Sequence, residues 1–162
     1  MNAMETTAVQ GRADLAGKYL TFRMAGEEYG LEILKVQEII KMMDITRVPR
    51  APESVRGVIN LRGKVIAVVD LRVRFGLETT DTTEKTCVIV VQVKQGEKRV
   101  TMGLVVDEVS EVLDVSAQLI ESTPEFGTGV KTDFILGVGK IGQRVVMLLD
   151  VDRLLVESNG VL

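Results

Sequence analysis

The sequence predicts an all-β protein built from two small antiparallel barrels that pack side by side, with a few short helices. An internal repeat is the first indication: Gly30-Leu31 is echoed by Gly103-Leu104 at an offset of 73. Gly57-Val58 is echoed in the same way by Gly137-Val138, at an offset of 80. Hydrophobic residues make up 46% of the chain but aromatic ones only 4%, so short runs of valine, isoleucine and leucine must fill the core. No segment supplies the crossover helices that parallel strands require. These features indicate two related units in tandem.

The first unit opens with a hairpin. Apolar residues alternate with polar ones over 20–24 and 29–33, around a turn at 25–27, which predicts a hairpin with one buried face. The stretch 34–43 fits both helical and strand spacing, and short apolar runs do not settle such a choice. We interpret it as one helical turn at 34–36 followed by a strand.

A second hairpin gives the strongest local signal in the chain. Strands at 58–61 and 65–69 flank a tip at Arg62-Gly63. The second of these strands is apolar without alternation, as expected for a strand buried on both faces. Asp70 and Gly76 then delimit a short helix, because Asp favours helix N-caps and Gly favours helix ends.

Loops and a linker separate these elements. Pro49 and Pro52 mark the loop before the second hairpin, where a single helical turn is expected at 52–55. The second unit repeats the plan, with strands at 87–93, 99–106, 111–115, 134–141 and 145–149 and a short helix at 150–155. We expect a tail at 1–17, a first barrel at 18–77, a linker at 78–85, a second barrel at 86–156 and a frayed end at 157–162, with the segment at about 150–156 packing on the first barrel.

Composition and charge exclude several classes of partner. The 162-residue chain carries a net charge of −3 and its basic residues are scattered, whereas nucleic-acid binding needs a concentrated basic surface. No apolar stretch approaches the length of a membrane helix, and the polar N-terminus is unlike a signal peptide. We therefore expect a soluble intracellular protein with no nucleic-acid partner and no direct membrane insertion. The single cysteine, Cys87, allows no internal disulfide and is expected to be a buried, unreactive thiol.

Little in the chain points to catalysis. It contains no histidine, which removes most nucleophile pairs, imidazole relays and catalytic zinc sites. Three carboxylate pairs remain as acid and base candidates, but each also fits a turn, a strand end or a helix cap. They are Glu27-Glu28, Asp107-Glu108, and Asp150 with Asp152. Residues 137–142 match G-x-G-x-x-G, yet a strand follows where a dinucleotide site needs a helix. The sequence therefore favours a protein without enzyme activity, metal or cofactor.

Two residues are candidates for protein recognition. Arg62 precedes Gly at a hairpin tip, where a rigid support projects a permanently charged side chain, and arginine is enriched among interface anchors. The alternative is that Arg62 only solvates a turn. Phe126 lies in a loop between Pro124 and Gly127, where a large aromatic residue is better placed to anchor a partner than to fill the core.

The Asn60-Leu61-Arg62-Gly63 tip, together with segments 29–39, 68–72 and 103–113, forms a specific pattern. In these segments the sequence closely resembles the CheW family of bacterial chemotaxis coupling proteins, and the resemblance extends from 18 to about 155. It implies two SH3-like five-stranded barrels, which agrees with the internal repeat. It also implies a cytoplasmic adaptor at the inner face of the membrane, in receptor arrays. Its partners would be the cytoplasmic tips of methyl-accepting chemotaxis receptors and the regulatory domain of the histidine kinase CheA.

The resemblance also implies three sets of contact residues. The kinase interface would contain Val36, Ile45, Gly57, Asn60, Leu61 and Arg62. The receptor groove between the barrels would contain Ile33, Glu38, Ile39, Val88 and Val105. Glu125 and Phe126 would form a second-barrel contact that closes receptor arrays into rings, although Glu121 is acidic where some relatives carry a basic residue. Alternatives remain open from the residues themselves: Ile33, Val36 and Val88 fit core positions equally well, and Gly57 fits a backbone requirement.

A rival hypothesis is a small enzyme or ligand-binding double barrel that uses the groove between the halves as a pocket. An adaptor forms a complex with a receptor fragment and a kinase, whereas an enzyme binds a small molecule alone. A nucleic-acid-binding pair of barrels is disfavoured by the charge and by the scarcity of aromatic residues.

Overall fold

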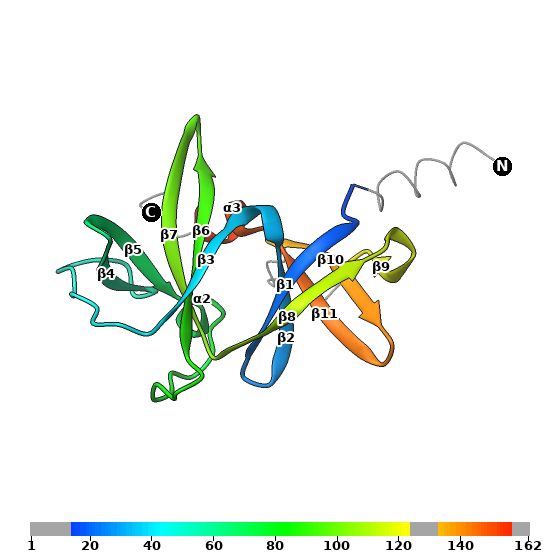
Figure 1. Ribbon diagram of the computed structural model, residues 1–162, viewed down its shortest axis with the longest axis horizontal. Coiled ribbons are helices and arrows are strands. Elements are labelled where there is room, and N and C mark those ends of the chain that lie inside the picture. The colour runs from blue at the N-terminus through cyan, green and yellow to red at the C-terminus, as the bar shows by residue number, and fades with distance from the viewer. Residues whose placement is uncertain (1–13, 124–132, 157–162) are drawn as a thin grey trace.

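The computed structural model, which describes residues 14–123 and 133–156, consists of two β-sheets and four short helices in those ranges (Figure 1). Sheet A has the order β8 (Glu108–Val115), β1 (Gly17–Met24), β2 (Glu27–Glu32), β11 (Arg144–Leu149), β10 (Ile135–Ile141) and β9 (Ile120–Glu121). Sheet B has the order β3 (Val36–Lys41), β6 (Cys87–Gln95), β7 (Lys98–Val106), β5 (Lys64–Asp70) and β4 (Val55–Leu61). The helices are η1 (Ile33–Lys35), α2 (Leu71–Arg74), η2 (Ala117–Leu119) and α3 (Val151–Val156).

The predicted hairpin turns are confirmed. Ala25 and Gly26 between β1 and β2 have φ of 52° and 83°, and Arg62 and Gly63 between β4 and β5 have φ of 54° and 86°. Two successive residues with positive φ are typical of the turn whose twist matches that of the flanking strands. The tip at Arg62 is therefore fixed by the backbone of the hairpin.

The two repeats exchange their first hairpins. The β1–β2 hairpin of the first repeat pairs with β8 and β11 of the second, and the β6–β7 hairpin of the second repeat pairs with β3 and β5 of the first. Each sheet thus contains strands from both repeats. We expected one barrel at 18–77 and another at 86–156, whereas each observed sheet takes strands from both repeats. The two repeats are similar enough for the first hairpin of either one to complete either barrel.

Two of the nine strand pairings in the described ranges are parallel, β2 with β11 and β5 with β7. The expectation of antiparallel strands throughout is wrong at these two places. A parallel pair needs a long connection, and here the exchange supplies it. Gly30 lies opposite Leu148 and Gly103 lies opposite Val68, so the two glycines occupy equivalent positions in the repeats.

Each sheet closes on itself. Thr46, in the segment after β3, exchanges backbone hydrogen bonds of 2.9 and 2.8 Å with Val58 of β4, the opposite edge of sheet B. In sheet A the segment after β8 forms β9, where Glu121 lies opposite Val138 of β10. Val58 and Val138 correspond at the offset of 80. We call the closed sheets barrel A and barrel B.

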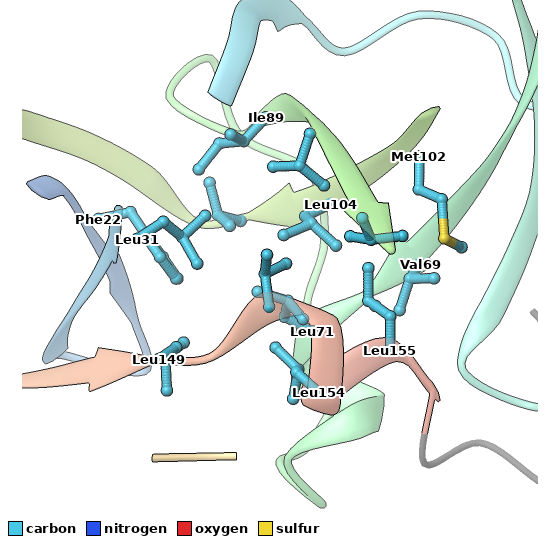
Figure 2. Close-up of a cluster of buried hydrophobic side chains, with 14 of the residues drawn as sticks. Phe22, Leu31, Val69, Leu71, Ile89, Met102, Leu104, Leu149, Leu154 and Leu155 are labelled. Atoms are coloured by element: carbon cyan, nitrogen blue, oxygen red, sulfur yellow. The ribbon is translucent and has the colours of Figure 1, made fainter. Parts of the chain in front are cut away.

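The barrels share one hydrophobic core (Figure 2). Phe22, Leu31 and Leu149 of sheet A meet side chains of sheet B and of the two α-helices, including Leu104 of β7 and Leu154 of α3. We call this cluster the shared core. Separate clusters fill the two barrels, one around Ile59, Ile66, Val68, Val88, Val90 and Val105 in barrel B and one around Tyr19, Val115, Ile120, Val146 and Leu148 in barrel A. The helix α3 packs on β6 of barrel B, a strand that lies outside the expected first barrel at 18–77.

Burial on both faces is confirmed for β5 and also occurs in β6. Val68 lies in the core of barrel B and Val69 in the shared core, although Val65 at the start of β5 is 64% exposed. Strand β1 differs from the single buried face expected for it. Thr21 is fully buried, and its hydroxyl exchanges hydrogen bonds with the backbone of Glu111, at 2.8 Å as donor and 3.1 Å as acceptor.

Local elements agree with the sequence except at two places. The turn of helix near 34–36 is η1, and α2 begins after Asp70, whose Oδ1 accepts from the Arg72 amide at 3.0 Å. Residues 52–55 form a turn, closed by a 2.9 Å bond from the Val55 amide to the Pro52 carbonyl, instead of a helical turn. η2 and β9 were not expected, because a three-residue helix and a two-residue strand leave too short a pattern to detect.

Candidate interaction surfaces

The β4–β5 hairpin presents Arg62 at an exposed tip of barrel B. The Arg62 side chain is 72% exposed. The amide of Gly63 donates to Oδ1 of Asn60 at 2.8 Å, which holds the turn. The predicted position of Arg62 at an exposed tip is confirmed.

Arg62 forms a two-pronged ion pair with Glu38 of β3. Nη1 and Nη2 of Arg62 donate to the two carboxylate oxygens of Glu38 at 2.6 and 2.7 Å. The hydrogen bonds from Arg62 lower the pKa of Glu38, and the same contact raises the pKa of the guanidinium. The resemblance assigned these residues to different surfaces, but the structure brings them together across the two edges of sheet B.

The remaining residues expected at the kinase interface divide between two places. Ile45 and Leu61 are partly buried against the core of barrel B, close to the hairpin. Val36 packs against the shared core instead. Gly57 is buried, and a Cβ at this position would overlap the carbonyl oxygen of Thr46. The alternative interpretation, a backbone requirement for glycine at this position, is therefore correct. Gly57 is not a surface residue.

The residues expected in the receptor groove also separate by burial. Ile39 is 45% exposed and Ile33 is partly buried against the shared core. Val88 and Val105, only 0% and 5% exposed, lie inside barrel B. Their assignment to the groove lining is wrong, because strands β6 and β7 are covered on both faces and leave neither side chain at a surface.

Val112 is an exposed apolar residue that sequence reasoning missed. It is 49% exposed in β8 and is the counterpart of Ile39 at the offset of 73. Ile39 pairs with Ile89 and Val112 pairs with Leu20, and both partners belong to the shared core. Since paired residues of adjacent strands point to the same face, the two exposed side chains flank the shared core on their respective sheets. The repeat offset was the signal that could have found Val112.

The expected ring-contact residues Glu125 and Phe126 lie outside the described residues. Glu121, which precedes that loop, accepts a 3.1 Å hydrogen bond from Nζ of Lys140, and both side chains are exposed.

The candidate acid–base pairs serve structural ion pairs and caps. Glu28 accepts from Arg144 at 2.9 and 3.0 Å, and these hydrogen bonds lower its pKa. Asp107 accepts from Arg72, and Asp150 caps the start of α3 through a 3.2 Å bond from the Arg153 amide. Within 14–123 and 133–156, no three side chains of the metal-binding kinds gather at one place. Burial raises the pKa of the half-buried Cys87 thiol.

One cleft lies on barrel B, away from the junction of the two barrels. It is open, has a volume of about 650 Å³, and is lined by the loop 45–56 of barrel B and by Thr79 and Thr80 of the linker. The rival hypothesis of a pocket between the halves gains no support from its position. None of the helices that the structure describes is long and apolar enough to cross a membrane.

Two closed barrels, a charged hairpin tip and exposed apolar side chains beside a shared core define a double-barrel module for binding proteins. The sequence profile of the CheW-like domain matches residues 18–159, and the chain belongs to this family.

Comparisons with individual proteins agree. The chain is 38% identical over 155 residues to the chemotaxis protein CheW of Klebsiella aerogenes, covering 96% of this chain and 91% of that protein. It is 34% identical over 145 residues to the chemotaxis protein CheW of Bacillus subtilis, covering 90% and 86%. The crystal structure of the scaffolding protein TtCheW from Thermoanaerobacter tengcongensis matches with a TM-score of 0.78 at 35% identity, covering 90% of this chain and 95% of that one. The chain is thus a chemotaxis adaptor built from two SH3-like barrels, as the resemblance implied.

Proposed function

We propose that the chain joins transmembrane chemoreceptors to the histidine kinase CheA without a chemical step of its own. The adaptor would act in the cytoplasm, held at the inner face of the membrane by receptor arrays. Membership of the CheW-like family supports this role, and the absence of histidine from the sequence agrees with a protein that binds and does not catalyse.

The β4–β5 hairpin of barrel B would bind the regulatory domain of the kinase. The observation that carries this assignment is Arg62, a largely exposed guanidinium on a turn with a fixed backbone. Asn60 holds the turn, and Ile45 and Leu61 lie beside it on the barrel core. A fixed side chain loses little conformational freedom on binding, which favours affinity.

The rim of the shared core would bind the receptor tip. Ile33 of the connecting helix η1 and Ile39 of β3 supply apolar surface, and Glu38 lies on the same strand as Ile39. Val112 of barrel A extends this apolar rim. We expect Val88 and Val105 to support the strands from inside the barrel and to make no direct contact.

The loop containing Glu125 and Phe126 would supply the further contact that closes arrays into rings. Phe126→Ala should leave the melting temperature nearly unchanged and weaken array formation. A loss of several degrees would instead place Phe126 in the core.

Charge reversal at the hairpin tip tests the kinase assignment. Arg62→Glu should abolish the rise in kinase activity in a mixture with receptor and kinase, because the reversed charge adds repulsion to the lost contact. Lys140→Glu is a matched control: Lys140 lies in the corresponding hairpin of barrel A, is exposed, and also pairs with a glutamate. This control should activate the kinase like the parent. If Arg62→Glu activates as fully as Lys140→Glu at matched concentrations, the hairpin is not the kinase-binding surface.

A further inference from the structure

The chain passes between the two sheets at two crossovers. At the first crossover, η1 connects β2 of sheet A to β3 of sheet B. At the second, Asp107 connects β7 of sheet B to β8 of sheet A. Each repeat leaves one barrel and enters the other at its crossover.

Arg72 of α2 binds the second crossover. Its Nε and Nη2 donate to the two carboxylate oxygens of Asp107 at 2.8 and 2.6 Å, and its Nη1 donates to the Glu78 carbonyl at 2.8 Å. Asp107 Oδ2 also accepts from the Ala25 amide at 2.8 Å. α2 follows sheet B whereas Ala25 belongs to the first hairpin of sheet A, so this group of contacts, the Arg72 clamp, connects the barrels.

Asp152 of α3 binds the first crossover. Its Oδ2 accepts from Nζ of Lys35 in η1 at 2.9 Å, and its Oδ1 accepts from the Lys94 amide in β6 at 2.8 Å. α3 follows sheet A, while Lys94 belongs to sheet B. This second group of contacts, the Asp152 clamp, therefore also connects the barrels. Here the helix follows sheet A and contacts a strand of sheet B, the reverse of the Arg72 clamp.

The two clamps occupy corresponding places in the repeats but carry opposite charges. Asp152 is the counterpart of Arg72 at the offset of 80, and Asp107 lies one residue before the counterpart of Lys35 at the offset of 73. In the Arg72 clamp the helix is positive and the crossover negative. In the Asp152 clamp the helix is negative and the crossover positive.

We propose that these opposite signs select the exchanged pairing of the repeats over the alternative in which each first hairpin stays with its own repeat. In that alternative β1–β2 would take the place of β6–β7 in barrel B, which would bring Lys35 beside Arg72. Asp107 would likewise lie beside Asp152 in barrel A. Both clamps would then join like charges, which repel strongly where they are partly shielded from water. The exchanged arrangement joins opposite charges at both places.

Two other ion pairs do not distinguish the two arrangements, although Glu28–Arg144, which joins β2 of the first repeat to β11 of the second, does. Glu38–Arg62 joins β3 to the β4–β5 hairpin, all within the first repeat, and Glu121–Lys140 joins β9 to β10 within the second. Each of these pairs would survive unchanged if the first hairpins returned to their own repeats. Glu121–Lys140 is therefore the control pair for an experiment on the clamps.

The double variant Arg72→Asp with Asp152→Arg tests the proposal, because it keeps the composition and net charge of the chain while placing like charges in both clamps. We expect its melting temperature to fall by about 6 °C or more. Adding Lys35→Asp and Asp107→Arg restores opposite signs and should recover at least half of that loss. Reversal of the control pair, Glu121→Lys with Lys140→Glu, should change the melting temperature little.

The strand pairing that the chain reaches after refolding from denaturant shows whether the clamps select the exchanged fold or only stabilise it. Nuclear Overhauser contacts between Ile39 and Ile89 report the β3–β6 pairing of the exchanged fold. The parent and the fourfold variant should show them in the whole population, and the double variant should contain a population in which they are replaced by contacts between β3 and β1. Complete β3–β6 pairing in the refolded double variant, whatever its melting temperature, would overturn the proposal. If the double variant does not fold, Arg72→Asp and Asp152→Arg are refolded singly and judged by the same contacts.

Discussion

Replacing Gly57 by alanine tests whether this residue serves the fold or the partner surface. Gly57 has a φ of 149°, which L side chains rarely adopt. A Cβ here would overlap the carbonyl oxygen of Thr46 and lie 2.9 Å from Cγ2 of Ile45. Thr46 is the residue that closes barrel B through its hydrogen bonds of 2.9 and 2.8 Å with Val58. The added methyl group should therefore open the barrel at this edge.

The size of the effect follows from those contacts. Each lost hydrogen bond contributes a net of about 1 kcal/mol, and backbone strain of this kind costs about 1–3 kcal/mol. Gly57→Ala should lower the free energy of unfolding by about 3–5 kcal/mol, or the melting temperature by about 6–20 °C for a chain of this length.

Thermal melting followed by circular dichroism measures this loss, with Gly137→Ala as the control. A Cβ on Gly137 in barrel A would lie 3.0 Å from the Glu121 carbonyl oxygen, a separation that a small shift relieves. We expect this control to lose only about 1 kcal/mol. If Gly57→Ala melts like the parent but no longer binds the kinase, the backbone argument is wrong and Gly57 belongs to the interface.

Three further predictions concern the core, an ion pair and the thiol. Leu104→Ala removes a fully buried side chain from the shared core and should cost about 2–5 kcal/mol while both barrels still unfold in one transition; two separated transitions would contradict a shared core. Arg144→Gln should destabilise the protein more at pH 7 than at pH 3, because the stabilisation from the lowered pKa of Glu28 is complete above the pH at which the unfolded carboxyl titrates and is lost as the pH falls towards the folded pKa. Melting curves of parent and variant at both pH values measure this, and an equal gap at both would refute it. Cys87 should react with a thiol reagent at pH 8 more slowly than in the unfolded chain, because burial raises its pKa, and equal rates would show an accessible thiol.

Local features of the fold could be predicted from the sequence because their causes lie within a few residues. The tip at Arg62-Gly63 needs positive φ at both positions, and the Asp70 cap needs only the next helical turn. Burial of β5 on both faces could be recognised from its unbroken apolar run. These signals do not depend on where the rest of the chain packs.

The exchange between repeats could not be predicted in this way. Two similar hairpins fit either half, and the charges that distinguish the halves at Arg72 and Asp152 become meaningful only when the crossovers are seen beside them. For the same reason the sequence alone could not show that Val88 and Val105 are buried inside the barrel. An apolar residue in a strand points to one face or the other, and only the tertiary packing shows that both faces of β6 and β7 are covered.

We propose above that this chain joins receptor and kinase. The most direct measurement is the autophosphorylation rate of CheA in the presence of a receptor cytoplasmic fragment, as increasing amounts of the chain are added. We predict a rise that saturates as the adaptor sites fill, and no rise when the receptor fragment is omitted. A rate that stays unchanged across the titration, with chain that is folded by circular dichroism, would contradict the claim.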